Sequence, residues 1–338
     1  MAEGFITRRG GVKSEQALAP TINQVSIDTT SITFTITNND TETATIAYRI
    51  SSSTADGETL SLAGGATSSN ITIGGLDAGT SYTIFSSANV QGKIKSNLTE
   101  FPFTTIVTFI SATGGTIETY EDNGTFYKSH TFTSSGTFTV NSLASTSALN
   151  QVEYLIIAGG GGGAGGSGSF RGGGGGGGGL TQAFTTVALD SYSVSVGAGG
   201  SKGIDTDDQM TAGGSSSVFG VTVTGGDAGV RGGNGGDAGT NGFSGGTGSG
   251  GLPGGGGGRT SAGSSGGAGG AGGAGFVFQE ATYSAGGDGG QVPPVGNATN
   301  SPANSGRGGD GSGTRSEGST GGNGGSGIVI ITYEVGAL

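Results

Sequence analysis

Hydrophobic and polar residues alternate with a period of two along several stretches of the first hundred residues. Residues 32–36 have the sequence Ile-Thr-Phe-Thr-Ile, and residues 46–50 repeat the alternation. This period places one face of a β-strand in a core and the other face in water. Turn signals such as Asp56-Gly57 separate the alternating stretches. The pattern predicts seven strands, the number in an immunoglobulin-like sandwich, at residues 21–27, 31–37, 44–50, 58–62, 70–73, 81–89 and 98–104.

A second β-region is expected from residue 106 onward. Residues 127–132 and 137–140 flank a Ser-Ser-Gly turn, which is a hairpin signal. The pattern therefore predicts a mostly β chain, with an arm at 1–19, a sandwich at 20–105 and a second sandwich at 106–338 with glycine-rich insertions at about 158–327. Further strand-like segments lie at 152–157, 188–196, 216–223, 276–278 and 328–333.

Glycine dominates the second region. The chain has 81 glycines among 338 residues, whereas average usage is roughly 7%. Because glycine loses the most backbone freedom on ordering, such tracts either stay disordered or gain a compensating lattice. A flexible linker is one alternative, but here glycine runs alternate with strands. Collagen requires strict Gly-X-Y triplets rich in proline, which six prolines in a drifting register do not provide.

Packed polyproline II helices are the interpretation we favour. Such a helix has three residues per turn and no internal hydrogen bonds, so its amides need partners on neighbouring helices. Glycine allows the close approach that such bonds require. Residues 266–275 show the period of three, with alanines on one face. Less regular helices are expected from the runs at 159–166, 172–179, 232–236, 245–258 and 286–290.

Charge and residue usage exclude several function classes. A net charge of −11 argues against nucleic-acid binding, which requires a Lys/Arg field. The chain has no cysteine, and its one histidine, His130, lies in a Thr/Ser-rich strand, where a core or solvated role is expected. The glycine strings lack a GxxxxGK[ST] motif. We expect no catalytic residues, no cofactor and no metal, and therefore no enzyme.

Acidic residues adjoin glycines at several places. The Asp205–Asp208 segment is expected to be a surface loop, with a weak cation site as the alternative. Other aspartates are expected to form turns, namely Asp227, Asp237, Asp288 and Asp310. The N-terminus lacks an apolar signal core and no stretch is long enough to cross a membrane, so we expect assembly in the cytoplasm and no membrane insertion.

Large side chains that interrupt the glycine runs are candidates for binding. A large side chain does not fit between close-packed glycine helices, so it lies at a turn or on an outer face, and exposed aromatic and Arg residues favour recognition. The alternative is that these residues plug the ends of the module against the β-core. The candidates are Phe170, Arg171, Phe243, Leu252 and Tyr283. A basic N-terminal cluster is either a flexible terminus or an arm that docks on a partner; its candidates are Phe5, Arg8, Arg9 and Lys13.

Residues 76–82, Leu-Asp-Ala-Gly-Thr-Ser-Tyr, resemble the tyrosine-corner segment of fibronectin type III domains. The resemblance covers roughly 85 residues. It implies that Leu76 packs inward and that the Tyr82 hydroxyl bonds to nearby backbone. The usual Trp of the second strand is missing, and Phe34 is expected to fill the core in its place. The resemblance implies a spacer or binding module.

A second resemblance covers roughly residues 106–335. The hairpin at 132–140, the strand 154–158 that runs into glycines, and the segments 194–200 and 325–331 resemble the glycine-rich domain of phage tail and fibre proteins. The opening at 4–11 is similar to that of prophage tail proteins. The glycine helices resemble those of adhesins at the tips of long tail fibres, whose loops meet the host receptor.

These resemblances imply a virion protein, assembled in the host cytoplasm and acting outside the cell. The expected partners are other virion proteins through the N-terminus, a host glycan or outer-surface protein through the loops, and further copies of the chain. A purely architectural capsid or neck fibre, a cell-surface protein and a mature secreted protein whose signal has been removed remain alternatives. An ice-binding protein would need a regular threonine-rich face, and a depolymerase would need paired carboxylates in a groove.

Overall fold

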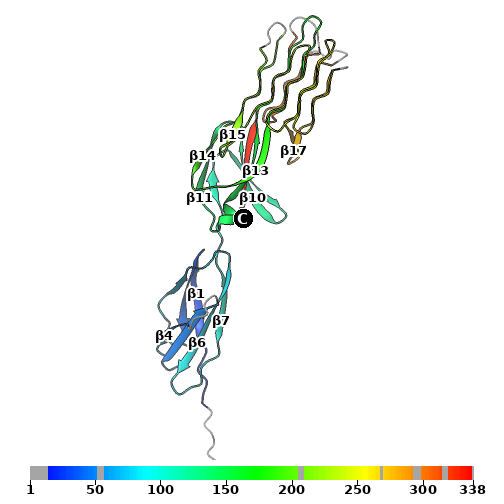
Figure 1. The fold of residues 1–338 in the computed structure, drawn as a ribbon. Coiled ribbons are helices and arrows are strands. Elements are labelled where there is room, and N and C mark those ends of the chain that lie inside the picture. The colour runs from blue at the N-terminus through cyan, green and yellow to red at the C-terminus, as the bar shows by residue number, and fades with distance from the viewer. Residues whose placement is uncertain are drawn as a thin grey trace, which may run out of the picture. The chain divides into compact units, whose positions relative to one another are not determined.

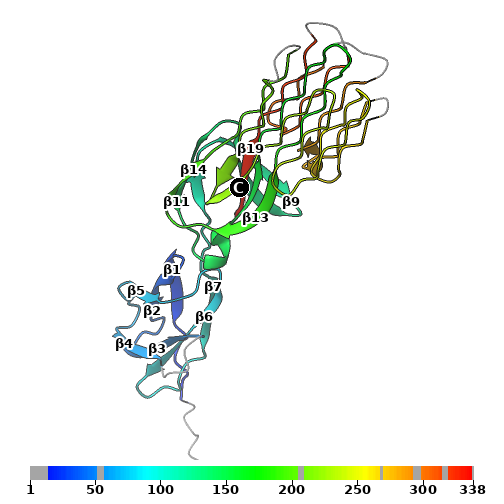
Figure 2. The same cartoon turned by 45° about the horizontal axis from the view of Figure 1, so that its top comes forward.

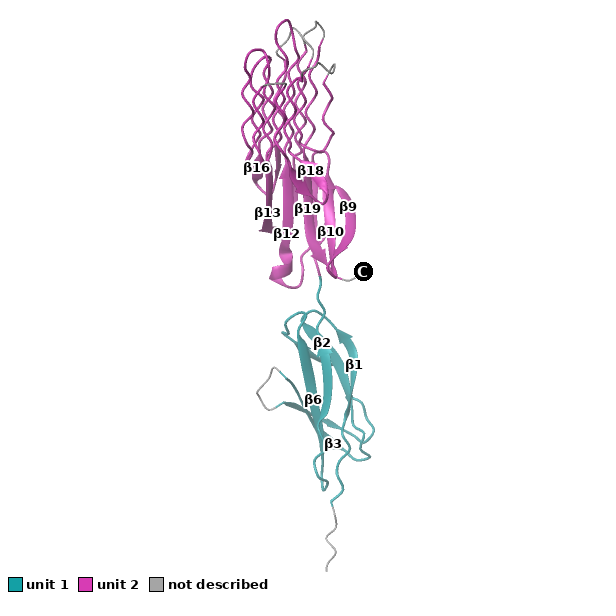
Figure 3. Ribbon diagram, turned by 90° about the vertical axis from the view of Figure 1, so that its right-hand side faces the viewer, with its two compact units in different colours: residues 1–108 teal, residues 109–338 magenta. Residues whose placement is uncertain are grey.

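The computed structural model describes residues 14–51, 57–204, 209–266, 269–291, 298–313 and 319–336. Over these residues the fold is mostly β, with 40% strand, 1% helix, several antiparallel sheets and no closed barrel, which is consistent with the expected β-sandwich class. The chain divides into two compact units, Met1–Thr108 and Phe109–Leu338 (Figure 3).

The first unit is a sandwich of two antiparallel sheets, with strand orders β1-β2-β5 and β4-β3-β6-β7. Each strand lies within one residue of its expected bounds, because each buries one face and exposes the other. Ile32 and Phe34 of β2 meet Ile46 and Ile84 of the other sheet in one core. The strands are β1 Thr21–Ile27, β2 Ser31–Thr37, β3 Ala44–Ile50, β4 Glu58–Leu62, β5 Ile71–Gly74, β6 Ser81–Val90 and β7 Thr99–Thr104.

Leu76 and Tyr82 lock one corner of this sandwich. Leu76 is 7% exposed and belongs to the core. The Tyr82 hydroxyl accepts a hydrogen bond from the Asp77 amide at 2.9 Å, as the sequence suggests. Phe34 is fully buried and packs edge-on against the Tyr48 ring, so an aromatic residue fills the centre of the core without a Trp.

The second unit begins with its own sandwich (Figures 1 and 2). A five-stranded antiparallel sheet, ordered β13-β12-β19-β10-β9, faces a smaller sheet ordered β14-β11-β8. Two short hairpins, β15–β16 and β17–β18, complete the β-structure. The strands are β8 Ser111–Thr113, β9 Thr116–Asp122, β10 Thr125–Phe132, β11 Gly136–Ser142, β12 Gln151–Ile157, β13 Leu180–Thr186, β14 Ser191–Val194, β15 Ser216–Val218, β16 Val221–Val223, β17 Phe276–Phe278, β18 Ala281–Tyr283 and β19 Ile328–Val335, with a 3-10 turn at Ser147–Asn150.

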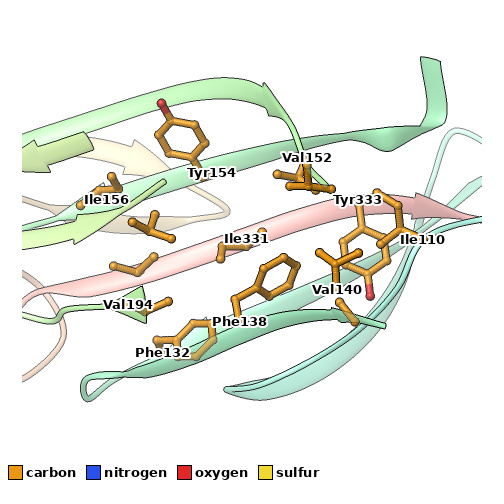
Figure 4. Packing of buried hydrophobic residues seen from close by; sticks show 14 of the residues in the cluster. Ile110, Phe132, Phe138, Val140, Val152, Tyr154, Ile156, Val194, Ile331 and Tyr333 are labelled. Carbon is orange, nitrogen blue, oxygen red and sulfur yellow. The ribbon is translucent and has the colours of Figure 1, made fainter. Parts of the chain in front are cut away.

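The core of this sandwich is aromatic and aliphatic (Figure 4), and His130 is buried beside it. His130 is fully buried and its ring stacks on Tyr333 at 5.5 Å. Its Nδ1 lies 2.7 Å from the Gly114 carbonyl oxygen and its Nε2 lies 3.1 Å from the Tyr333 hydroxyl. Burial lowers the pKa of His130. Both ring nitrogens are satisfied within the core, so His130 is a core residue, one of the two expected roles.

Beyond the sandwich, the glycine-rich segments run side by side as extended rods (Figures 1 and 3). Successive amides of the rod 158–164 donate in turn to three different rods, and the partner rod recurs at every third residue. This three-residue repeat is the geometry of polyproline II. The bonds, 2.8–3.0 Å long, run from Ala158, Gly161 and Ala164 to the carbonyl oxygens of Gly179, Gly176 and Gly173; from Gly159 and Gly162 to Gly214 and Thr211; and from Gly160 and Gly163 to Gly325 and Gly322.

Three inner rods, 158–164, 172–179 and 253–258, are each surrounded by six others. The rod 172–179 donates amides to three neighbours and accepts amides at its carbonyls from three more. Every residue of the three rods is buried. The neighbours of 172–179 lie at 224–230, 254–257 and 306–312 as acceptors, and at 158–164, 236–239 and 287–290 as donors.

Close packing explains why the inner rods consist almost entirely of glycine. A Cβ at Gly161 would lie 1.9 Å from the Asp227 carbonyl oxygen, and one at Gly256 would lie 1.9 Å from that of Gly175. No side chain fits there without separating the rods. The longest uninterrupted glycine runs, which were expected to form the less regular helices, therefore occupy the centre of the bundle. The run at 245–258 contains a turn that divides it into two rods.

Edge rods carry a larger residue at every third position. In one edge rod the exposed residues are Thr224, Asp227 and Val230, and in another they are Ala271 and Ala274. One of the three sides of such a rod faces solvent, so only that side accommodates a side chain. The expected alanine face of 266–275 is present at the described alanines of that segment.

The outward amides of edge rods are capped by side chains. Asp237 Oδ1 accepts from the Gly245 amide at 2.9 Å, and Asp288 Oδ1 accepts from the Gly272 amide at 2.7 Å. Asp310 in turn accepts from the amide of Asp288 at 3.0 Å. These aspartates replace the missing neighbouring rod as acceptors. They lie along rods rather than in turns, which corrects the expectation that they form turns.

Candidate recognition surface

The end of the bundle farthest from its sandwich is formed by tight turns between rods (Figures 1 and 2). Ser167 and Phe170 exchange backbone hydrogen bonds of 3.0 and 2.9 Å across a two-residue turn. Gly168, its first central residue, has a φ of 54°. The Ser249–Leu252 turn is closed in the same way, with positive φ at Gly250 and Gly251. Both turns need glycine, because other residues are strained at positive φ.

Turns that are distant in sequence touch one another at this end. The Phe170 ring lies against Gly232, where an added Cβ would be 2.3 Å from Phe170 Cδ1. The Gly232 amide donates to the Arg171 carbonyl oxygen at 2.7 Å. Gly232 itself has a φ of 62°. The 167–170 and 230–233 turns therefore form one surface, and both are anchored to inner or neighbouring rods of the lattice.

Exposed apolar side chains gather on this distal surface. Phe170 is 50% exposed and Val230 is 51% exposed. Ile204, 44% exposed, ends another rod and pairs with Thr320 next to the 158–166 segment. Leu252 in the next turn is partly buried. We define the distal surface as Phe170, Ile204, Val230 and Leu252.

Three sequence candidates occupy other places. Arg171 is only 8% exposed, and its Nε donates to the Gly313 carbonyl oxygen at 3.0 Å, so it ties rods together rather than presenting a charge. Phe243 is 49% exposed but lies at the sandwich end of the bundle, in the turn next to Asn241, whose side chain bonds to the Leu180 carbonyl oxygen. Tyr283 lies in β18 and packs on the sandwich, and burial raises its pKa. Phe243 and Tyr283 thus lie at the sandwich end of the bundle, as the alternative expected, whereas Arg171 is buried at the distal end and fits neither expected place.

Sequence reasoning missed Ile204 and Val230. Both are single aliphatic residues at the ends of glycine rods, the same signal that identified Leu252. The docking candidates Phe5, Arg8, Arg9 and Lys13 and the Asp205–Asp208 loop lie outside the described residues. Among the described residues, no group of three or more His, Asp or Glu side chains is placed to hold a metal ion. No helix in the described part of the chain is long and apolar enough to span a membrane.

The fold and the distal surface define a class of protein: a β-sandwich that carries a hydrogen-bonded bundle of glycine helices with loops at its far end. A family model described as a glycine-rich domain matches residues 131–334. The chain belongs to this glycine-rich domain family. A comparison with curated proteins finds no match.

Proposed function

We propose that the chain is a structural protein of a virion, specifically a phage fibre or adhesin whose distal surface recognises the host cell surface. In this proposal the first unit is a fibronectin type III-like spacer and the N-terminal arm docks on other virion proteins. The protein performs no catalysis and needs no cofactor. It works outside the cell after assembly in the host cytoplasm, as several copies on one particle.

The observation that carries the proposal is the distal surface itself. Apolar side chains from separate turns are held together at one end of a lattice whose inner rods are bonded on all sides. Loops fixed in this way lose little entropy on binding a partner. Exposed apolar residues on a rigid scaffold can also serve as the anchor residues of a binding interface. Several copies on one particle would add avidity.

Cell binding by matched variants tests this proposal. The full chain is fluorescently labelled and its binding to cells of the host is measured by flow cytometry. Phe170→Ser and Val230→Ser are expected to reduce binding at least about tenfold, because each removes an apolar anchor. Phe243→Ser is the control, since Phe243 has nearly the same exposure, 49% against 50% for Phe170, at the opposite end of the bundle.

Immunogold labelling of intact virions locates the protein. Label at a tail or fibre tip, together with the loss of binding in the distal variants, supports host recognition. Label over the capsid or neck with no binding to cells would establish the architectural alternative instead. Absence of label from particles would support the cell-surface alternative.

A further inference from the structure

The five-stranded sheet of the second unit has one face that is only half covered. Its inner face packs into the aromatic core of the sandwich. On its outer face, the end next to the glycine rods is covered by the β17–β18 hairpin, whose Phe276, Phe278 and Tyr283 pack on Leu155 and its neighbours. Toward the other end of the strands, the outer face carries no such cover among the described residues (Figure 3).

The strand registers place the side chains of this open region in two rows across the sheet. The first row has its one aromatic residue at the β13 edge, the second row has its two aromatic residues on β10 and β9, and the other positions are polar. One row is Phe184, Glu153, Thr332, Ser129 and Glu118; the next is Thr186, Gln151, Glu334, Tyr127 and Tyr120.

A pocket of about 350 Å³ lies over these rows. On one side stand Tyr120 and Tyr127, whose rings stack at 5.5 Å with an interplanar angle of 22°. On the other side stands Phe184, which is 62% exposed. Between them are Glu153 and further polar residues, namely Gln151, Thr332 and Glu334. The volume is in the range of small-ligand sites.

The pocket offers three carboxylates that accept hydrogen bonds, Asp122, Glu153 and Glu334, and neutral groups that both donate and accept, such as the Gln151 amide and the Thr332 hydroxyl. The lining contains no Lys, Arg or His, so an anionic ligand would meet repulsion from the carboxylates. Glu153 is held in place by the Gln182 amide nitrogen at 2.6 Å from its Oε1. Carboxylates form strong, charge-assisted bonds with hydroxyl donors. The carboxylates do not assemble as a metal site among the described residues.

The spacing of the strands that carry the aromatic residues favours an extended ligand over a small cation. Phe184 lies on β13 and Tyr127 on β10, three strand positions apart, which corresponds to about 14 Å between strands. An ammonium group gains from a ring only within about 6 Å of its centroid, so aromatic flanks on strands this far apart favour a ligand longer than one such group. A chain of sugar rings has apolar C–H faces for both aromatic flanks and hydroxyls for the acidic floor between them.

We propose that this pocket, bounded by the stacked Tyr120–Tyr127 pair and Phe184, binds a neutral oligosaccharide. The site lies on the sandwich and is separate from the distal surface, so it does not rest on the proposed function. Because the ligand proposed for this pocket is neutral, the pocket differs from a site that would bind an acidic glycan.

Affinity electrophoresis of the full chain tests the proposal. Native gels contain mannan, a glucan or a galactan as neutral probes, chitosan as a cationic probe and alginate as an anionic probe. The full chain is expected to be retarded by at least one neutral polysaccharide. Tyr127→Ala and Phe184→Ala are each expected to weaken that binding about tenfold, and Glu153→Gln to weaken it less, because an amide still accepts hydrogen bonds.

Two control variants show whether retardation depends on this pocket. Val277→Ala truncates a side chain that is 63% exposed on the neighbouring hairpin, and Phe170→Ser removes a distal anchor; both are expected to keep full retardation. Thermal unfolding checks that the variants remain folded. If Tyr127→Ala does not fold, Phe184→Ala still tests the proposal, because the Phe184 side chain is exposed. Retardation by chitosan or alginate alone, no retardation by any neutral probe, or wild-type binding by Phe184→Ala would overturn the proposal.

Discussion

A single methyl group added to an inner rod tests the lattice most directly. Gly175 lies in the middle of the 172–179 rod, and a Cβ there would be 2.2 Å from the Gly161 carbonyl oxygen. Carbon–oxygen contacts normally begin at about 3.3 Å, so Gly175→Ala must push the two rods about 1 Å apart. That displacement lengthens the three hydrogen bonds between 158–164 and 172–179, now 2.8–2.9 Å, beyond bonding distance.

The expected loss of stability follows from those bonds. Each buried group left without a partner costs about 1–3 kcal/mol, so three bonds give a loss of at least about 3 kcal/mol. Replacing Gly by Ala normally gains only about 0.4–1 kcal/mol through the unfolded chain. For a unit of this size, about 3 kcal/mol corresponds to a decrease in Tm of roughly 6–12 °C.

Differential scanning calorimetry of the full chain measures this effect on the transition of the second unit. Ala271→Val is the control, because Ala271 is exposed on an edge rod and its side chain has room outward; it is expected to leave that transition within about 2 °C of wild type. An unchanged or raised Tm in Gly175→Ala would refute close packing, and it is the result that a flexible glycine linker would give.

Two further predictions concern pH. Because burial lowers the pKa of His130 from its ordinary 6.5, the unfolded state binds the proton more readily; the contribution of neutral His130 is present above about pH 6.5 and is lost as the pH falls below it. The Tm of wild type should therefore fall as the pH is lowered from 8 to 5, and the Tm of His130→Gln should fall less. Parallel curves of Tm against pH for the two proteins would contradict this. In the first unit, Lys93 donates to the buried Asp40 carboxylate at 2.8 Å and holds its pKa at about 2. The stability from this pair is present above about pH 3.8 and is lost as the pH falls toward 2. In an acid titration followed by circular dichroism, Lys93→Met should therefore unfold at a higher pH than wild type. Equal unfolding midpoints for the two proteins would contradict this expectation.

The strands of the first unit could be read from the sequence because most of them bury one face more than the other. In β2, Ile32, Phe34 and Ile36 point into the core while the threonines between them do not, and this alternation is a local property of the chain. The tyrosine corner is local as well, because Tyr82 bonds to an amide five residues away. Local patterns of this kind fix both the element and its bounds.

The rods could be read only in part. A pure glycine run indicates a rod with neighbouring rods on every side. A larger residue at every third position indicates a rod with one side exposed to solvent. Which rod lies beside which is a matter of contacts between distant segments: Arg171, expected at an exposed tip, instead bonds to Gly313, 142 residues away. The same holds for Asp310, whose carboxylate caps an amide on another rod.

The sequence by itself determined that this chain is mostly β, since strand alternation is a local pattern, and the period of three at 266–275 indicated helices with three residues per turn. Only the tertiary structure decided which runs are central, which turns meet on the distal surface, and that two tyrosines and Phe184 flank one pocket. Those relations depend on strand register and rod order. Both are set by hydrogen bonds between segments far apart in the chain, so no local pattern encodes them.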